Sequence, residues 1–351
     1  DAFSDMPEIN RKNNSLRTHG IFKKVEPLKF QFLGAMENPE RTQIFYSPVL
    51  GWNNYNKTML GLAFYNSLLP SKNFEYMLMP LYSFGAKNIN GSANIDYNWY
   101  PAHSAFQSIK LKMEYKKYSY GDNPFIMNYQ KIAPSLNFSF RKKDARRPIE
   151  HSFILRTIIV NKEEVKYTKV ETLNFVSLKR EKINNNYYIN ELKYQFINKN
   201  TLTPHNASID IQQGEGFVKA ALEANYNFIY RGKNRGFDIR LFAGKFIFNQ
   251  NTSNSQYGFA MDGSSDYLYD RTYLDRSKTS KIFNKQFTID EGGFKNLTAI
   301  PASDNWLLSV NLKTSFPGRL PLRLYADCGL ASNNTDIVYD TGVELTLIRN
   351  I

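Results

Sequence analysis

The feature that most constrains this chain is a two-residue alternation of apolar and polar side chains. In VKAALEANYNFIYR, residues 218–231, apolar residues occupy every second position, and Lys, Glu, Asn and Arg are among the residues between them. A period of two predicts a β-strand, because successive side chains leave a pleated strand on opposite faces. Tilted as in a barrel, a strand of this length projects about 35 Å along the barrel axis, enough to cross a membrane.

The same alternation recurs along the chain, for example at residues 108–116, 306–316 and 339–347. About fifteen strand-like segments lie between Leu28 and Ile348, separated by residues that suit turns, and we see no helical segment of convincing length. The longest interruption runs from about 249 to 304, far beyond a hairpin connection. We expect a functional loop or a lumen plug there.

Composition excludes a helical membrane protein. The chain of 351 residues is 42% hydrophobic, yet its mean hydropathy is negative and no run approaches the roughly 18 apolar residues of a membrane-spanning helix. The 23 Tyr and 26 Phe residues suit strands, and Tyr also suits a membrane interface. A soluble β-protein with an aromatic core is the alternative that composition leaves open.

The net charge of +13 suggests a polyanionic partner, but the basic residues are spread along the whole chain. The one dense basic run, RKKDARR at 141–147, lies between two strand-like segments and predicts a solvated loop, with contact to lipid phosphate or lipopolysaccharide as the alternative. No phosphate loop, helix-turn-helix or RNA-binding pattern is present, so we expect no nucleic-acid partner.

The sequence contains no recognisable catalytic or metal-binding pattern. Cys328 is the only cysteine, and the four histidines are scattered singly. Neither a zinc-binding spacing nor a Gly-x-Ser-x-Gly elbow occurs. We therefore expect no catalytic residue, no cofactor and no metal ion.

These observations predict an all-β fold, an antiparallel transmembrane β-barrel of about 14–16 strands that lacks its closing strand. A polar lead-in or linker (1–18) precedes a single barrel domain (19–351) with its long loop at 249–304. The length of the best strands, the charge on their polar faces and the lack of a domain break favour a barrel over a two-sheet sandwich. In a barrel the apolar face meets lipid and the polar face lines a wet lumen.

The face assignment follows from the alternation. The predicted lipid-facing residues are Ile109, Leu111, Met113, Val218, Leu222, Tyr226 and Phe228. The predicted lumen-facing residues are Lys110, Lys112, Glu114, Glu223 and Arg240.

Several strings resemble the C-terminal region of large zinc aminopeptidase-like proteins (gluzincins) of Bacteroidetes. They include YSPVLGWNNYNKTMLGLAFYN, SSDYLYDRTYLDRS and DNWLLSVNLKTSFPGRLPLRLYADCGL, so the resemblance covers nearly the whole chain after about Phe30. It implies a fragment of a longer protein, in which a peptidase domain precedes a β-rich membrane segment. Peptidase activity would then belong to the upstream domain, and this segment would be a non-catalytic anchor.

More distantly, the long loop followed by RLYADCGL is similar to the end of insertase and two-partner-secretion barrels of the outer membrane. In those barrels a late loop folds into the lumen and the next strand carries Asp-x-Gly. The resemblance assigns Asp327 and Gly329 to the strand motif, and Arg271 or Arg276 to the lumen-reaching arginine of the loop. In that family an Arg-Gly-Phe or Arg-Gly-Tyr string lies within the late loop. This chain differs, because its NRGF string at 234–237 precedes the long loop.

Three functions therefore remain open. The first is an anchor in the outer membrane of a Gram-negative bacterium, with or without a substrate passage through its lumen, whose partners are membrane lipid, lipopolysaccharide and the upstream domain. The second is a protein insertion or secretion pore. The third is a soluble or surface-exposed β-sandwich that binds glycans on Trp52, Trp99 and Tyr100.

Overall fold

The computed structural model describes residues 28–34, 42–66, 72–144, 146–172, 175–230, 236–251, 255–263, 266–271, 274, 290–316 and 321–345. The predicted lead-in at 1–18 and Arg276 lie outside these residues. The strands are β1 (Leu28–Phe32), β2 (Thr42–Asn53), β3 (Lys57–Tyr65), β4 (Phe74–Ser83), β5 (Asn88–Trp99), β6 (Phe106–Gly121), β7 (Met127–Phe140), β8 (Ile149–Thr172), β9 (Phe175–Asn198), β10 (His205–Gly214), β11 (Phe217–Ile229), β12 (Gly236–Asn249), β13 (Trp306–Ser315), β14 (Leu322–Ala331) and β15 (Asn334–Leu345).

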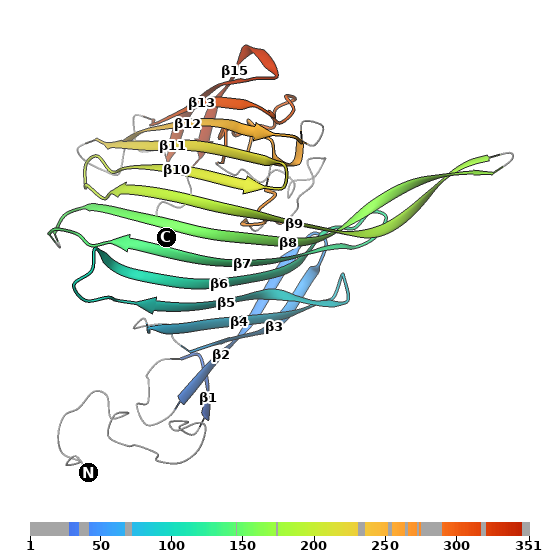
Figure 1. The fold of residues 1–351 in the computed structure, drawn as a ribbon, viewed down its shortest axis with the longest axis horizontal. Helices are drawn as coiled ribbons and strands as arrows, with labels where there is room; N and C mark the ends of the chain where they lie inside the picture. Colours follow the sequence, from blue (N-terminus) through green and yellow to red (C-terminus); the bar gives the residue numbers. More distant parts are fainter. Residues whose placement is uncertain are drawn as a thin grey trace.

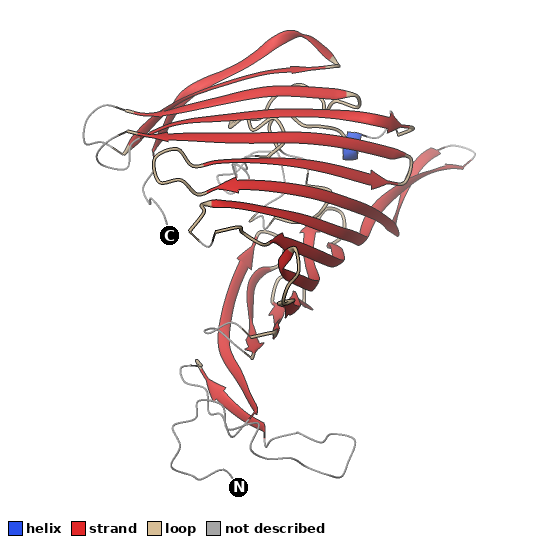
Figure 2. Ribbon diagram, turned by 60° about the vertical axis from the view of Figure 1, so that its left-hand side comes forward, coloured by secondary structure: helices blue, strands red, loops and turns tan. Residues whose placement is uncertain are grey.

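All of these strands form one 15-stranded sheet in which the spatial order equals the chain order. Each strand-like segment expected from the sequence overlaps one of them, so the all-β prediction and its strand number are confirmed. The sheet curves strongly, and the described part of the loop between β12 and β13 lies inside the curve (Figure 2). The described strands do not close into a ring, because β1 and β15 are both edges of the sheet. A two-sheet sandwich is excluded for the described residues.

The expected antiparallel arrangement holds from β2 to β15 but is wrong at the first strand. β1 pairs with β2 in parallel, with Leu28 opposite Thr42 and Phe32 opposite Tyr46. Alternation determines which face a side chain occupies, but it carries no information on the direction of the neighbouring strand. The sequence pattern of this edge strand was therefore compatible with either pairing.

The β8–β9 hairpin is much longer than its neighbours. Its two strands pair with each other from Ile149 and Asn198 to Thr172 and Phe175. Pairing of β7 with β8 ends at Lys162, and pairing of β10 with β9 ends at Ile189. Beyond those positions the hairpin pairs only with itself and projects from the sheet as a two-stranded arm (Figure 1).

The two faces of the sheet differ in chemistry. The outer face carries exposed, large apolar side chains on nearly every strand, among them Leu50, Leu60, Ile95, Leu111, Ile132, Leu155, Ile209, Leu222, Leu241 and Leu308. The inner face carries buried polar or charged side chains, among them Lys131, Lys162, Glu191, Gln212, Lys219, Arg240, Asn311 and Asp327. Soluble proteins seldom expose so extended an apolar surface.

The loop between β12 and β13 packs against the inner face. Its residues Phe259, Met261, Tyr267, Tyr269 and Phe294 belong to one buried cluster with strand residues from β7 to β14. A short 3-10 turn, η2 (Ser255–Tyr257), starts this region, and Phe259 and Ser303 form a bridge with N to O distances of 2.8 Å in both directions. The main packed core thus lies between this loop and the inner, concave face of the sheet. We call this face of the sheet the wall.

No helix in the part of the chain that the structure describes is long and apolar enough to span a membrane.

Candidate functional site

The candidate site is the contact between the loop and the inner wall. We call the first part of this contact the Asp270 latch, made of Asp270, Lys131 and Arg156. Arg156 on β8 donates from both terminal nitrogens to the two Asp270 oxygens, at 2.8 Å each, and Lys131 on β7 also binds this carboxylate. Such bidentate Arg–carboxylate pairs fix geometry as well as adding energy. One loop carboxylate therefore joins two strands of the wall.

The electrostatics of the Asp270 latch favour the ionised carboxylate. Lys131 is fully buried and also lies 3.4 Å from Glu114, while Arg156 also pairs with Glu191. Burial alone would raise the pKa of Asp270, but the Arg156 and Lys131 cations outweigh burial and lower this pKa to about 2. The latch therefore stays ion-paired throughout the neutral and mildly acidic range.

A second contact joins the loop to the last strands of the sheet. We call it the Lys295 latch, made of Lys295, Asp327 and Asn311. Lys295 on the loop lies 3.0 Å from the fully buried Asp327 on β14, which also accepts a hydrogen bond from Asn311 Nδ2 at 3.1 Å. The ammonium group also lies 4.1 Å from the centre of the Tyr325 ring, within cation–π distance. The loop is thus held at two separate places on the wall.

Glycines allow the loop backbone to approach the wall near the Lys295 latch. Gly293 has a φ of +72°, and a Cβ atom there would lie 2.5 Å from Arg240 Nη1 and 2.6 Å from Asn311 Oδ1. A Cβ atom on Gly329 of β14 would lie 2.4 Å from the Met261 sulfur on the loop. Both positions require a residue without a Cβ atom or a displacement of the neighbouring side chain.

Gly293→Ala should weaken loop docking, because it adds both backbone strain and a clash with Arg240 and Asn311. A non-glycine residue in the left-handed region costs about 1 to 3 kcal/mol. The control is Gly216→Ala in the β10–β11 turn, where φ is also positive, at +75°, but where a Cβ atom would lie no closer than 3.0 Å to its nearest neighbour, the side chain of Asn251 at the beginning of the loop. Limited proteolysis of the folded protein should cut the 250–305 loop faster in Gly293→Ala than in Gly216→Ala. Equal rates would contradict the docking role of Gly293.

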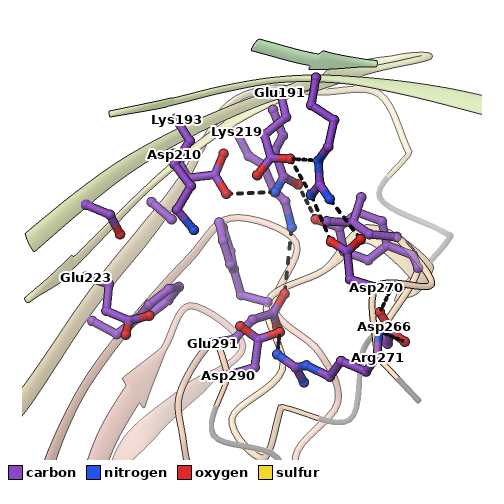
Figure 3. Close-up of a pocket in the computed structure, with 18 residues that line it drawn as sticks. Glu191, Lys193, Asp210, Lys219, Glu223, Asp266, Asp270, Arg271, Asp290 and Glu291 are labelled. Atoms are coloured by element: carbon purple, nitrogen blue, oxygen red, sulfur yellow. Dashed lines mark hydrogen bonds and ion pairs between the residues drawn. The ribbon is translucent and has the colours of Figure 1, made fainter. Parts of the chain in front are cut away.

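Beside the Asp270 latch, a charged cavity of about 240 Å³ lies between the loop and the inner face of the sheet (Figure 3). Its carboxylates come from the wall, including Glu191 and Asp210, and from the loop, including Asp290 and Glu291. Lys219 reaches into the same region, donates to the Tyr257 carbonyl at 2.9 Å and lies 3.8 Å from Glu291. Among the described residues, no group of three His, Cys, Asp or Glu side chains is arranged to hold a metal ion.

Glu291 is the buried acid of this cavity. Burial raises the pKa of its carboxyl to about 8, and the neighbouring Asp290 carboxylate acts in the same direction, while Lys219 and Arg271 oppose both. The folded state therefore holds a proton on Glu291 at pH values where the unfolded chain, with a pKa near 4.5, has lost it. A folded state that binds more protons than the unfolded state loses stability as the pH rises.

We expect stability to fall as the pH rises from about 5 to about 8, and Glu291→Gln to reduce this slope. The measurement is the urea midpoint of the detergent-folded protein at several pH values in that window, for both proteins. An unchanged slope in Glu291→Gln would show that other groups cause the pH dependence.

The structure places the predicted residues on the faces expected from the alternation. Leu111, Met113, Leu222, Tyr226 and Phe228 are exposed on the outer face, and Ile109 and Val218 share that face while being partly buried. Lys110, Lys112, Glu114, Glu223 and Arg240 lie on the opposite face, which the loop contacts. Lipid contact and an aqueous lumen remain predictions.

The structure brings together only part of the motif that the resemblance assigned to the loop arginine and to Asp327 and Gly329 of the strand. Arg271 pairs with Asp290 inside the loop, whereas Asp327 binds Lys295. The site residues predicted from the sequence did not include Lys295, Lys131, Arg156 or Asp270. Lys295 belongs to the string DEGGFK, in which the glycine pair indicates close backbone approach and so marks this segment. No local sequence signal marks Lys131 as the partner of Asp270.

Comparisons with protein-family models and with curated proteins found no match. Among solved structures, the chain is similar to CdiB from Acinetobacter baumannii, with 12% identity, a TM-score of 0.38 and 88% of this chain covered. It is also similar to BamA from Haemophilus ducreyi lacking POTRA domains 1–3, with 10% identity, a TM-score of 0.42 and 84% of this chain covered. The chain spans 55% of the first of those chains and 60% of the second.

Proposed function

We propose that this chain is a non-catalytic β-barrel segment of a Gram-negative outer membrane, whose outer face contacts lipid and whose lumen is closed by the 250–305 loop. The observation that carries the proposal is that burial in this sheet is the reverse of burial in a soluble protein, with apolar side chains exposed and charged side chains buried. Large apolar side chains are exposed on the outer face, while Lys131, Arg240 and Asp327 are buried on the inner face. Lipid outside and a polar, loop-filled interior suit both faces.

The test is detergent-dependent folding. The protein is refolded with and without detergent or liposomes, and its circular dichroism and its gel mobility with and without heating are compared. The proposal predicts β-structure that requires detergent or lipid and a mobility that shifts on heating. A monodisperse β-protein formed without detergent would contradict it and would favour a soluble, glycan-binding protein built on this single sheet rather than on a sandwich.

The two latches favour a closed anchor over an open pore as the resting state. The loop is tied to β7 and β8 through Asp270 and to β14 through Lys295. A protein insertion or secretion pore is the second candidate, supported by the contacts of Asp327 with Lys295 and of Gly329 with Met261. Ion conductance in planar bilayers separates the two, because a closed anchor is silent until the loop is released.

We further propose, from the sequence resemblance, that the anchored domain is a zinc metallopeptidase upstream in the same chain. The test uses the full-length protein in cells. Peptidase activity should fractionate with the outer membrane, and deletion of residues 19–351 should release it into the soluble fraction. Activity that stays membrane-bound after the deletion would contradict an anchoring role for this segment.

A further inference from the structure

A hollow of about 410 Å³ lies on the outer face of the sheet, where strands β10 to β13 are neighbours. Ala243 of β12 lies opposite Leu222 of β11 and Leu308 of β13, so a single methyl group stands between two larger side chains. The hollow is completed by Ile209, Ala220, Ala221, Gly244, Lys245 and Trp306. We call it the outer hollow. Its volume is within the range of small-molecule sites, roughly 300 to 1,000 Å³.

Lys245 gives the outer hollow a positive charge. This residue alternates with the buried Phe246 along β12, so its side chain leaves the strand on the outer face. It is the only Lys, Arg, Asp or Glu at the outward positions of strands β10 to β14, all of which the structure describes. Its ammonium group has no ion pair and no hydrogen bond with any described residue. A lysine on a face that meets lipid costs free energy unless an anion accompanies it.

The charge and the apolar part of the outer hollow lie at different depths along the strands. Lys245 is four residues before Asn249, the last residue of β12. The row formed by Leu222, Ala243 and Leu308 is two residues nearer the middle of that strand. The lysine stem can pack on apolar groups while its ammonium group reaches toward the membrane surface. This arrangement matches a lipid whose phosphate lies toward the strand ends and whose acyl chain runs toward the middle of the bilayer.

The end of the sheet nearer to Lys245 is the end with the longest connections. Strands β8 and β12 run in the same direction, because each strand from β8 to β12 is antiparallel to the next. The β8–β9 arm and the start of the long loop after β12 therefore lie at the same end of the sheet (Figure 1). In outer-membrane barrels the longer loops are extracellular and the periplasmic turns are short. Lys245 is thus on the side of the outer leaflet, whose lipid in a Gram-negative bacterium is lipopolysaccharide.

We propose that the outer hollow binds lipid A, the phosphorylated and acylated anchor of lipopolysaccharide, with a phosphate on Lys245 and one acyl chain against Ala243. Lysine binds phosphate as a point charge, so the fit of the chain between Leu222 and Leu308 supplies the rest of the selectivity. This inference rests on the proposed membrane barrel and adds a specific lipid at one place on its outer face.

The test uses Trp306, which lines the outer hollow, as a fluorescent reporter. The other two tryptophans, Trp52 and Trp99, are exposed and are replaced by phenylalanine. The whole chain is inserted into vesicles of phosphatidylcholine with brominated acyl chains, which quench tryptophan on contact. Part of this lipid is then replaced by unbrominated lipid A, phosphatidylglycerol or phosphatidylcholine. A lipid that displaces brominated chains from the outer hollow restores the fluorescence of Trp306.

We expect lipid A to restore the fluorescence beyond simple dilution, with a preference over phosphatidylcholine of about fivefold, as for one lysine near a charged membrane surface. Phosphatidylglycerol should restore less, because its phosphodiester carries one negative charge and a phosphate monoester carries up to two. Restoration by lipid A that only equals dilution, or that does not exceed restoration by phosphatidylglycerol, would overturn the proposal. Fluorescence that brominated lipid does not quench would instead contradict the membrane barrel itself, and this proposal with it.

Variants locate the site. Lys245→Met should abolish the preference for lipid A, and Lys245→Arg should keep it. Ala243→Phe retains the charge but fills the outer hollow, so it should also reduce the preference. The control is Lys87→Met, since Lys87 is an exposed lysine in the β4–β5 turn at the same end of the sheet and does not line the outer hollow. An equal loss in Lys87→Met and Lys245→Met would show that overall charge selects the lipid and would overturn the assignment.

Discussion

Leu222→Arg should destabilise the folded protein by about 2 to 4 kcal/mol, because it places a charge on the lipid-facing side near the bilayer midplane. Leu222 lies near the middle of β11 and is 45% exposed, so in water an arginine at this position would be tolerated. The measurement is urea unfolding of the protein folded in lipid vesicles, followed by tryptophan fluorescence. A large loss of unfolding free energy at an exposed position would indicate that lipid surrounds the outer face.

Leu202→Arg is the matched control for this prediction. Leu202 is 50% exposed but lies in the turn between β9 and β10, beyond the strand ends. The same substitution there should change the unfolding free energy by about 0 to 1 kcal/mol. Equal effects of Leu222→Arg and Leu202→Arg would contradict a membrane environment for the outer face.

Asp270→Asn should release the loop from β7 and β8. The fully buried Lys131 and the partly buried Arg156, whose side chain is 19% exposed, would lose their shared carboxylate partner. Removing one member of a buried ion pair costs about 3 to 5 kcal/mol, and we expect about 2 to 3 kcal/mol here because Asp270 is 34% exposed. Urea unfolding gives the stability loss, and planar-bilayer recording should show ion conductance that is absent in the unmodified protein.

Glu150→Gln provides a closely matched control. Glu150 on β8 is 35% exposed and pairs with two cations, Lys142 at 2.9 Å and Lys199 at 2.8 Å. Their side chains are 23% and 60% exposed, whereas Lys131 is fully buried, and neither belongs to the loop. Its loss should cost about 0 to 1 kcal/mol and leave conductance unchanged. If both variants behave alike, the Asp270 latch does not hold the loop.

Much of this architecture was predictable from alternation. A face assignment at Leu222 and Glu223 requires only that side chains alternate, and the pleat enforces that rule along every strand. The long loop was located because no alternating segment fills residues 250–305. The basic run at 141–147 was expected to be a loop, and its described residues connect β7 to β8.

The parts that were missed have two physical causes, and the first is distance along the chain. The Asp270 latch joins residues separated by 139 and 114 positions, so no local pattern could show that these charges meet. The second cause is local, and it explains why the arm of β8–β9 was missed. Between Glu163 and Asn185 both faces of the hairpin are rich in polar residues, because neither packs on a wall, and the alternation that marks the other strands is lost there.

The most direct test of the central claim uses the single cysteine of the chain. Cys328 on β14 is exposed on the outer face, between the inner-face residues Asp327 and Gly329. A nitroxide attached to Cys328 in vesicle-inserted protein reports its surroundings through collisions with oxygen, which concentrates in lipid, and with a water-soluble nickel chelate. The account predicts high oxygen accessibility and low nickel accessibility. High nickel accessibility with low oxygen accessibility would place the outer face in water and contradict the account.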